Sequence, residues 1–197
     1  MIRSFQTFLS ASAVAALFAA GGATAAQFKT DQGHTEVNFG WSHAGVSMQS
    51  AEFSVADGTL DLDPENPGDA KLNVTIKADS VNTGFGPLDD HLKSNDFLEV
   101  QTYPEITFTS TSVEVTGEKT ANVTGDLTIH GTTKPVTLVT ELTHVGPHPL
   151  GGVVDYYKGE WIAFTAQTEI DHMAFGVGGF STGPISISIV TEMKAVE

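Results

Sequence analysis

Apolar and polar side chains alternate along most of this chain. The stretches 36–41, 71–77 and 185–189 each place an apolar residue at every second position. Because successive side chains of a β-strand point to opposite faces, this period predicts strands with one apolar and one polar face. The same pattern predicts further strands over 51–62, 105–115, 121–130, 136–145 and 161–170.

About eight such strands must bury their apolar faces against one another. Clusters of turn-forming residues separate them, as in PENPGD (64–69) and HGTTK (130–134). No helical pattern of 10 to 15 residues alternates with the strands, so the sequence does not favour a parallel α/β sheet. The expected fold class is therefore all-β and antiparallel, as a closed barrel or a two-sheet sandwich.

One segment, TGFGPLDDHLKSNDF (83–97), interrupts the alternation. Pro87 suits the first turn of a helix, and Leu88, His91 and Leu92 share one side at i, i+3, i+4 spacing. We predict a short helix near 87–96. Its acids and His91 have the residue types of an acid/base pair or a metal site. The alternative, which we favour, is structural: Leu92 and Phe97 attach the helix to the strands.

The first 26 residues have the features of a secretory signal peptide. Arg3 is followed by an apolar stretch over 9–20 and by the small residues 23–25. The apolar stretch is shorter than the roughly 20 residues that a spanning helix needs. We therefore expect cleavage before Ala26 or Gln27, export to the periplasm, and one domain over 27–197 without stable membrane insertion.

Charge and cysteine content exclude several functions. Without the leader the chain carries 8 lysines, no arginine and 24 acidic residues, a formal charge of −16. Nucleic acids and anionic lipid surfaces need a basic face, which these residues do not supply. With no cysteine, thiolate catalysis, cysteine-ligated zinc and disulfides are excluded.

The remaining chemical motifs are weak. His144 and His148 are four residues apart, but Gly146, Pro147 and Pro149 prevent the helix that would bring them together. No nucleophile elbow, Walker loop or dinucleotide fingerprint is present. From spacing alone we predict no catalytic residue and no metal site.

Four blocks of the sequence together resemble one family. They are DDHLKSNDF (89–97), YPEITFTS (103–110), VTGDLTIHGTTKPVTL (123–138) and the Ala174-Phe175-Gly176 turn before the last alternating strand. In this order and spacing they are similar to the YceI-like family of exported polyisoprenoid-binding proteins. VNFGWSHAG (37–45) resembles the first strand of that family, with His43 at its characteristic histidine.

The resemblance implies a single lipocalin-like, eight-stranded antiparallel barrel over 27–197 whose helix near 87–96 borders the lumen. It further implies a periplasmic protein that binds, sequesters or transports an isoprenoid or similar amphiphilic lipid, of the quinone or polyprenyl type, with no other cofactor. A homodimer is left open. The expected ligand-binding residues are Phe39, Trp41, His43, Phe53, Phe85, Leu88, His91, Phe97, Phe108, Leu127, Ile129, Leu138, Phe164, Phe175 and Ile187.

Two alternatives and one departure accompany this expectation. An exported lipid hydrolase or isomerase would use His43, His91 and Asp90 as acid/base groups, and a barrel filled with side chains would serve only as an interaction module. The chain also has Asp171-His172-Met173 where the family commonly has a basic residue before the Phe-Gly turn. The resemblance therefore assigns no basic head-group partner at that turn.

Overall fold

The computed structural model describes residues 26–179 and 183–196, so residues 1–25 of the predicted signal peptide lie outside the described residues. Strands dominate the described part, together with one α-helix, α1 (Gly86–Lys93), and short 3₁₀ helices. The strands are β1 (Ala26–His43), β2 (Ser47–Phe53), β3 (Ala56–Leu62), β4 (Lys71–Lys77), β5 (Val81–Asn82), β6 (Glu105–Val115), β7 (Thr120–Ile129), β8 (Thr132–Pro147), β9 (Glu160–Ile170) and β10 (Ile185–Ala195).

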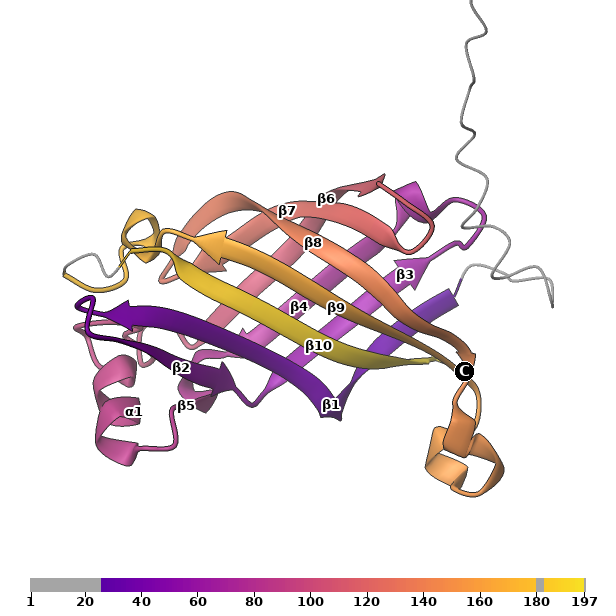
Figure 1. Ribbon diagram of the computed structural model, residues 1–197, viewed down its shortest axis with the longest axis horizontal. Coiled ribbons are helices and arrows are strands. Elements are labelled where there is room, and N and C mark those ends of the chain that lie inside the picture. The colour runs from indigo at the N-terminus through magenta and orange to yellow at the C-terminus, as the bar shows by residue number, and fades with distance from the viewer. Residues whose placement is uncertain (1–25, 180–182, 197) are drawn as a thin grey trace, which may run out of the picture.

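Eight of these strands close into an antiparallel barrel. Their order is β10-β9-β8-β7-β6-β4-β3-β1, and β10 also pairs with β1, which closes the ring (Figure 1). Strands β2 and β5 extend the wall at one end, because β2 pairs with β1 and β5 pairs with β2. The prediction of an all-β, eight-stranded antiparallel barrel is confirmed. Closure leaves no free edge in the ring.

The strand predicted over 51–62 is broken in two at Ser54 and Val55. The backbone N–H of Ser54 donates to the Ser80 carbonyl at 3.3 Å, and the N–H of Val55 donates to Ser80 Oγ at 3.2 Å. The neighbouring strand is interrupted at the same level by the 3₁₀ helix Ala78–Ser80. Both strands are therefore interrupted at the same level. The Ser80 hydroxyl accepts a hydrogen bond from the Val55 N–H, which strand pairing does not satisfy at this break.

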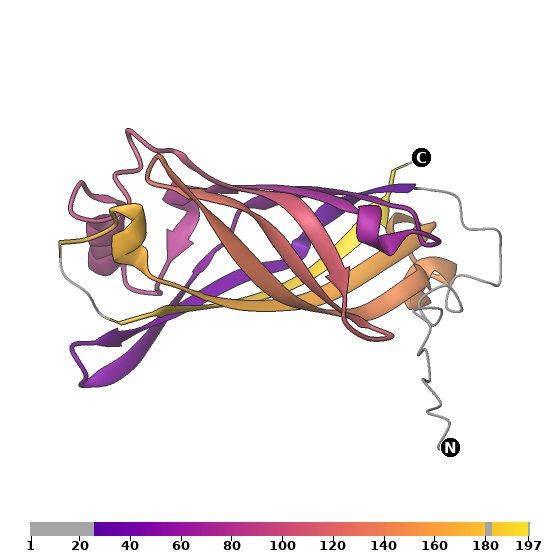
Figure 2. The same cartoon turned by 90° about the horizontal axis from the view of Figure 1, so that it is seen from above.

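The two ends of the barrel carry different structures. Helix α1 lies at the same end of the barrel as the β1–β2 hairpin, and the β8–β9 connection projects at the opposite end (Figures 1 and 2). That connection contains the 3₁₀ helices Pro149–Gly152 and Asp155–Tyr157. Within 26–179 and 183–196, no helix combines the length and the hydrophobicity needed to cross a membrane.

The inward side chains form two apolar groups. The larger includes Phe53, Ile106 and Phe108 and extends to the α1 end, while the smaller includes Phe28, Ile162 and Met193. Trp161 is almost fully buried, although it lies on the outer face between the β8–β9 connection and the barrel wall. The outer wall at this end is therefore covered by packed aromatic side chains.

Candidate functional site

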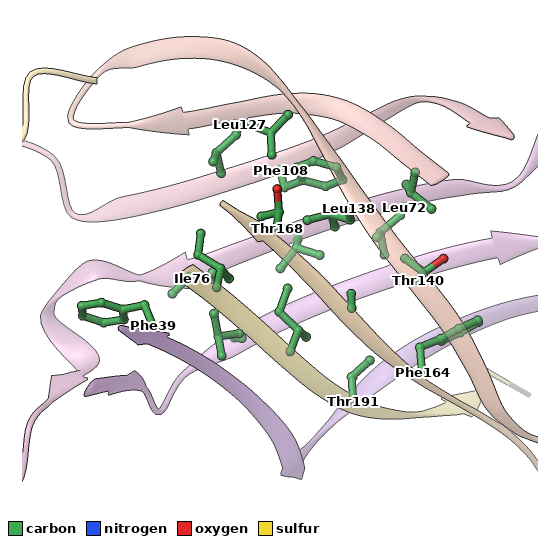
Figure 3. Close-up of a pocket in the computed structure, with 18 of the residues that line it drawn as sticks. Phe39, Leu72, Ile76, Phe108, Leu127, Leu138, Thr140, Phe164, Thr168 and Thr191 are labelled. Carbon is green, nitrogen blue, oxygen red and sulfur yellow. The ribbon is translucent and has the colours of Figure 1, made fainter. Parts of the chain in front are cut away.

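The barrel encloses an apolar cavity of about 600 Å³. Side chains from all eight ring strands line it, and Figure 3 shows several of them converging on the lumen. At one end the lining includes Glu118 and Lys119 of the β6–β7 hairpin; at the other it includes His43 and residues of α1. The volume lies within the range of about 300–1,000 Å³ that is typical of small-molecule pockets.

The structure places most of the predicted ligand-binding residues around this cavity. Those that line it are Phe39, Trp41, His43, Phe53, Leu88, His91, Phe97, Phe108, Leu127, Ile129, Leu138, Phe164 and Ile187. Phe85 and Phe175 do not. Phe85 directly precedes α1 and is 62% exposed, whereas Phe175 is buried in a 3₁₀ helix at the end of the barrel, packed within the core. Neither residue is therefore among those that line the cavity, and their contact with a ligand stays a prediction.

The polar groups of the lumen are largely bonded within its wall. Thr35 Oγ1 and Thr191 Oγ1 are 2.8 Å apart and bond to each other across β1 and β10. Thr140 Oγ1 donates to the Ala121 carbonyl at 2.8 Å. Thr30 Oγ1 accepts from the N–H of Gly58 at 2.9 Å. Because these hydroxyls are already satisfied, the lumen presents mainly methyl groups and rings to a ligand.

Sequence analysis did not name these threonines as lumen residues. Thr35, Thr140, Thr168 and Thr191 all line the cavity. Their positions agree with the alternation, since each lies two residues from an inward apolar side chain. Hydrophobicity does not distinguish these hydroxyl side chains, whereas the parity of each strand identifies all four. Which residues line the lumen therefore depends on their position along the strand rather than on their hydrophobicity.

Helix α1 is fixed at one mouth of the cavity by local hydrogen bonds. Thr83 donates to Asp89 Oδ1 from its backbone N–H at 2.7 Å and from Oγ1 at 2.6 Å. These bonds lower the pKa of the Asp89 carboxyl, the side-chain bond more than the backbone bond. Leu88 and Leu92 then face the lumen. The predicted structural role of this segment agrees with these contacts.

The histidines near this mouth do not assemble an acid/base site. His43 is exposed at the end of β1, and His91 is about half exposed with its Nε2 at 3.6 Å from Asp96 Oδ2. Among the described residues no hydrogen bond or ion pair joins His43, His91 and Asp90. General acid/base catalysis requires groups within hydrogen-bond reach of one another or of a substrate. Within the described residues, the hydrolase or isomerase alternative therefore has no preformed hydrogen-bonded pair among these three side chains.

His172 lies shortly before the Phe175-Gly176 turn, where the family commonly has a basic residue. It is buried, lines the cavity, and its Nδ1 donates to the Val177 carbonyl at 2.7 Å. This bond holds the loop that follows the 3₁₀ helix His172–Phe175. The imidazole is therefore anchored at the cavity wall.

A closed antiparallel barrel of eight strands around an apolar lumen defines a lipocalin-like binding protein. The family model of the YceI-like domain matches residues 28–195. The chain belongs to the YceI-like family, as its sequence blocks indicated.

Individual relatives agree with this assignment. Protein YceI of Escherichia coli O157:H7 is 46% identical over 138 residues, which cover 69% of this chain and 72% of the relative. The crystal structure of Campylobacter jejuni YCEI protein has a TM-score of 0.68 at 30% identity, covering 77% of this chain and 88% of its own. A polyisoprenoid binding domain from Saccharophagus degradans shares the fold, with a TM-score of 0.61 at 17% identity over 87% and 99% of the two chains.

Proposed function

We propose that this protein binds an isoprenoid or similar amphiphilic lipid, of the quinone or polyprenyl type, inside the barrel. The proposal includes sequestration or transport of that lipid in the periplasm without chemical change. The observation that carries it is the apolar cavity of about 600 Å³. Membership of the YceI-like family, and the likeness to a domain that is described as polyisoprenoid binding, support it.

The energetics favour a long apolar tail over a short one. Each buried methylene contributes about 0.8 kcal/mol, so one five-carbon isoprene unit contributes roughly 4 kcal/mol before any cost is subtracted. Association itself costs about 4–15 kcal/mol. A single unit therefore barely offsets the cost of binding, and several units are needed for useful affinity. The lumen requires no head-group contact to reach that affinity.

Affinity should rise with tail length until the lumen is filled. We expect prenyl alcohols of two, three and four isoprene units to bind with affinities that increase at least about tenfold per added unit, followed by a plateau. Displacement of a fluorescent prenyl probe measures this series. Straight-chain alcohols of matched carbon number serve as the control for tail shape.

Two results would contradict the proposal. Affinities that are weak and independent of tail length would show that the cavity does not take up the tail. Release of a modified lipid product during incubation would support the enzymatic alternative. The alternative of an interaction module whose barrel is filled with side chains does not agree with a cavity of this size.

Export is part of the proposal. Residues 1–26 have the charge, hydrophobicity and small-residue pattern of a signal peptide. We expect the protein to occur in the periplasmic fraction with Ala26 or Gln27 as its first residue, which N-terminal sequencing of the isolated protein measures. Cleavage at either site leaves nearly all of β1, which begins at Ala26. Isolation of the cytosolic protein with Met1 intact would contradict it.

A further inference from the structure

Strand β1 carries an irregular bulge where it pairs with β10. Thr30 pairs with Met193 and Thr35 pairs with Thr191, so the four residues 31–34 of β1 lie opposite the single residue Glu192 of β10. Thr191 and Met193 both line the lumen, and by alternation Glu192 points outward. Bulges of this kind re-aim side chains. Here the bulge places Asp31 and His34 beside Glu192.

These three side chains have the arrangement of metal ligands. One ligand atom from each of Asp31, His34 and Glu192 lies within 4.8 Å of the other two. In a tetrahedral site with bonds of about 2.1 Å the ligand atoms are roughly 3.4 Å apart. The cluster is therefore close to the required size. His34 is about half exposed and Glu192 one-third exposed, so both side chains have room to adjust.

Asp31 and His34 already have partners within the protein, whereas one oxygen of Glu192 has no hydrogen bond. Asp31 is only 8% exposed and accepts from the N–H of Gly33 at 3.0 Å, while His34 Nδ1 lies 2.7 Å from Asp31 Oδ2. Burial raises the pKa of Asp31, yet hydrogen bonds from His34, Gly33 and Tyr156 lower it overall. Within the described part of the chain, Glu192 Oε2 is buried and has no hydrogen-bond partner. An unsatisfied buried carboxylate oxygen is costly, and a cation would compensate it.

A neighbouring hollow borders Glu192. It has a volume of about 280 Å³, and its lining includes His144, His148, Trp161 and Glu192. His148 Nδ1 accepts from the N–H of Leu150 at 3.1 Å, so its proton resides on Nε2, which lies 3.6 Å from Glu192 Oε2. His148 Nε2 therefore faces Glu192 Oε2 from beyond hydrogen-bond distance, and a small shift of either side chain would bring the two into contact.

We propose that Asp31, His34 and Glu192 form a binding site for one divalent first-row transition metal ion of the zinc type. One imidazole and two carboxylates match that class better than magnesium or calcium, which prefer oxygen ligands alone. A water molecule in the hollow would complete the coordination. Spacing along the sequence did not reveal the site, because Glu192 is brought to the other two residues only by closure of the barrel between β1 and β10.

The test is a zinc titration of the purified, chelator-treated protein by calorimetry. We expect one Zn²⁺ per chain, and at least about tenfold weaker binding by Glu192→Gln and by His34→Gln. Glu36→Gln is the matched control, since Glu36 is an exposed acid of the same strand outside the cluster. It should bind zinc as the parent protein does.

A second measurement separates loss of a ligand from loss of the fold. Without metal, Glu192→Gln should melt at or above the temperature of the parent protein, because it changes a side chain whose Oε2 has no hydrogen-bond partner. Added zinc should then raise the melting temperature of the parent and of Glu36→Gln only. Equal zinc binding by all four proteins, or none by the parent, would overturn the proposal. So would a lower metal-free melting temperature of Glu192→Gln, which would indicate a purely structural carboxylate.

Discussion

Replacing Gly125 by alanine should destabilise the barrel by about 1–3 kcal/mol, the usual range for overpacking a tight interior. A Cβ at Gly125 would overlap Phe108 Cζ and would lie 2.6 Å from the Thr109 backbone oxygen. Rotation of the Phe108 ring could relieve only the first of these contacts. The second requires β6 and β7 to move apart, because the obstructing atom belongs to the backbone.

Denaturant midpoints at constant m-value measure this effect. Gly86→Ala is the control: a Cβ there meets nothing within 4 Å, and its stability should change by no more than about 0.5 kcal/mol. Combining Gly125→Ala with Phe108→Leu should recover only part of the loss, since the contact with Thr109 persists. Full recovery in the double variant would show that the ring alone, and not strand spacing, constrains this position.

Those parts of the fold that follow from local alternation could be predicted from sequence. The strand predicted over 105–115 coincides with β6, Glu105–Val115. There Ile106 and Phe108 are buried while their neighbours are less so, which is the signal that the period carries. Helix α1 was also predicted, because Pro87 and the apolar spacing after it are local. Its end at Lys93, earlier than expected, follows from the turn at Ser94, whose N–H and hydroxyl both donate to the His91 carbonyl.

What could not be predicted depends on contacts between distant segments. The break at Ser54 and Val55 requires Ser80 as a partner, and the bulge over 31–34 is visible only in the register against β10. Phe85 and Phe175 show a different limit. Both were predicted as ligand-binding residues, but Phe85 precedes α1 and Phe175 ends a 3₁₀ helix, where strand parity does not apply. Hydrophobicity alone could not place them.

The strongest effect on ligand binding is expected from a charge placed inside the lumen. Leu138 is 8% exposed in the middle of β8, lines the cavity, and is labelled in Figure 3. Leu138→Lys would place an ammonium group in apolar surroundings. A lysine whose pKa falls from about 10.4 to about 7 loses roughly 4–5 kcal/mol of stability at neutral pH. Retention of a prenyl probe should fall at least about a hundredfold, because the tail would have to desolvate that group.

The adjacent residue provides the matched control. Val139 is 61% exposed on the outer face of the same strand, so Val139→Lys should change both stability and retention little, within about 0.5 kcal/mol for stability. The comparison tests strand parity directly. Similar losses in both variants would contradict the inward orientation of Leu138 that the cavity proposal requires.

A milder variant covers the case in which Leu138→Lys does not fold. Leu138→Ala in a packed core costs about 2–5 kcal/mol, since a void remains where the side chain was. Beside a cavity that a lipid occupies, the ligand-free protein already lacks packing partners on one side, so the cost should lie at or below the lower end of that range. Probe retention should fall at the same time, because the lost methyl groups faced the tail. A full core-type loss of stability with unchanged retention would instead show that Leu138 belongs to a packed interior, and the lipid-carrier proposal would then be wrong.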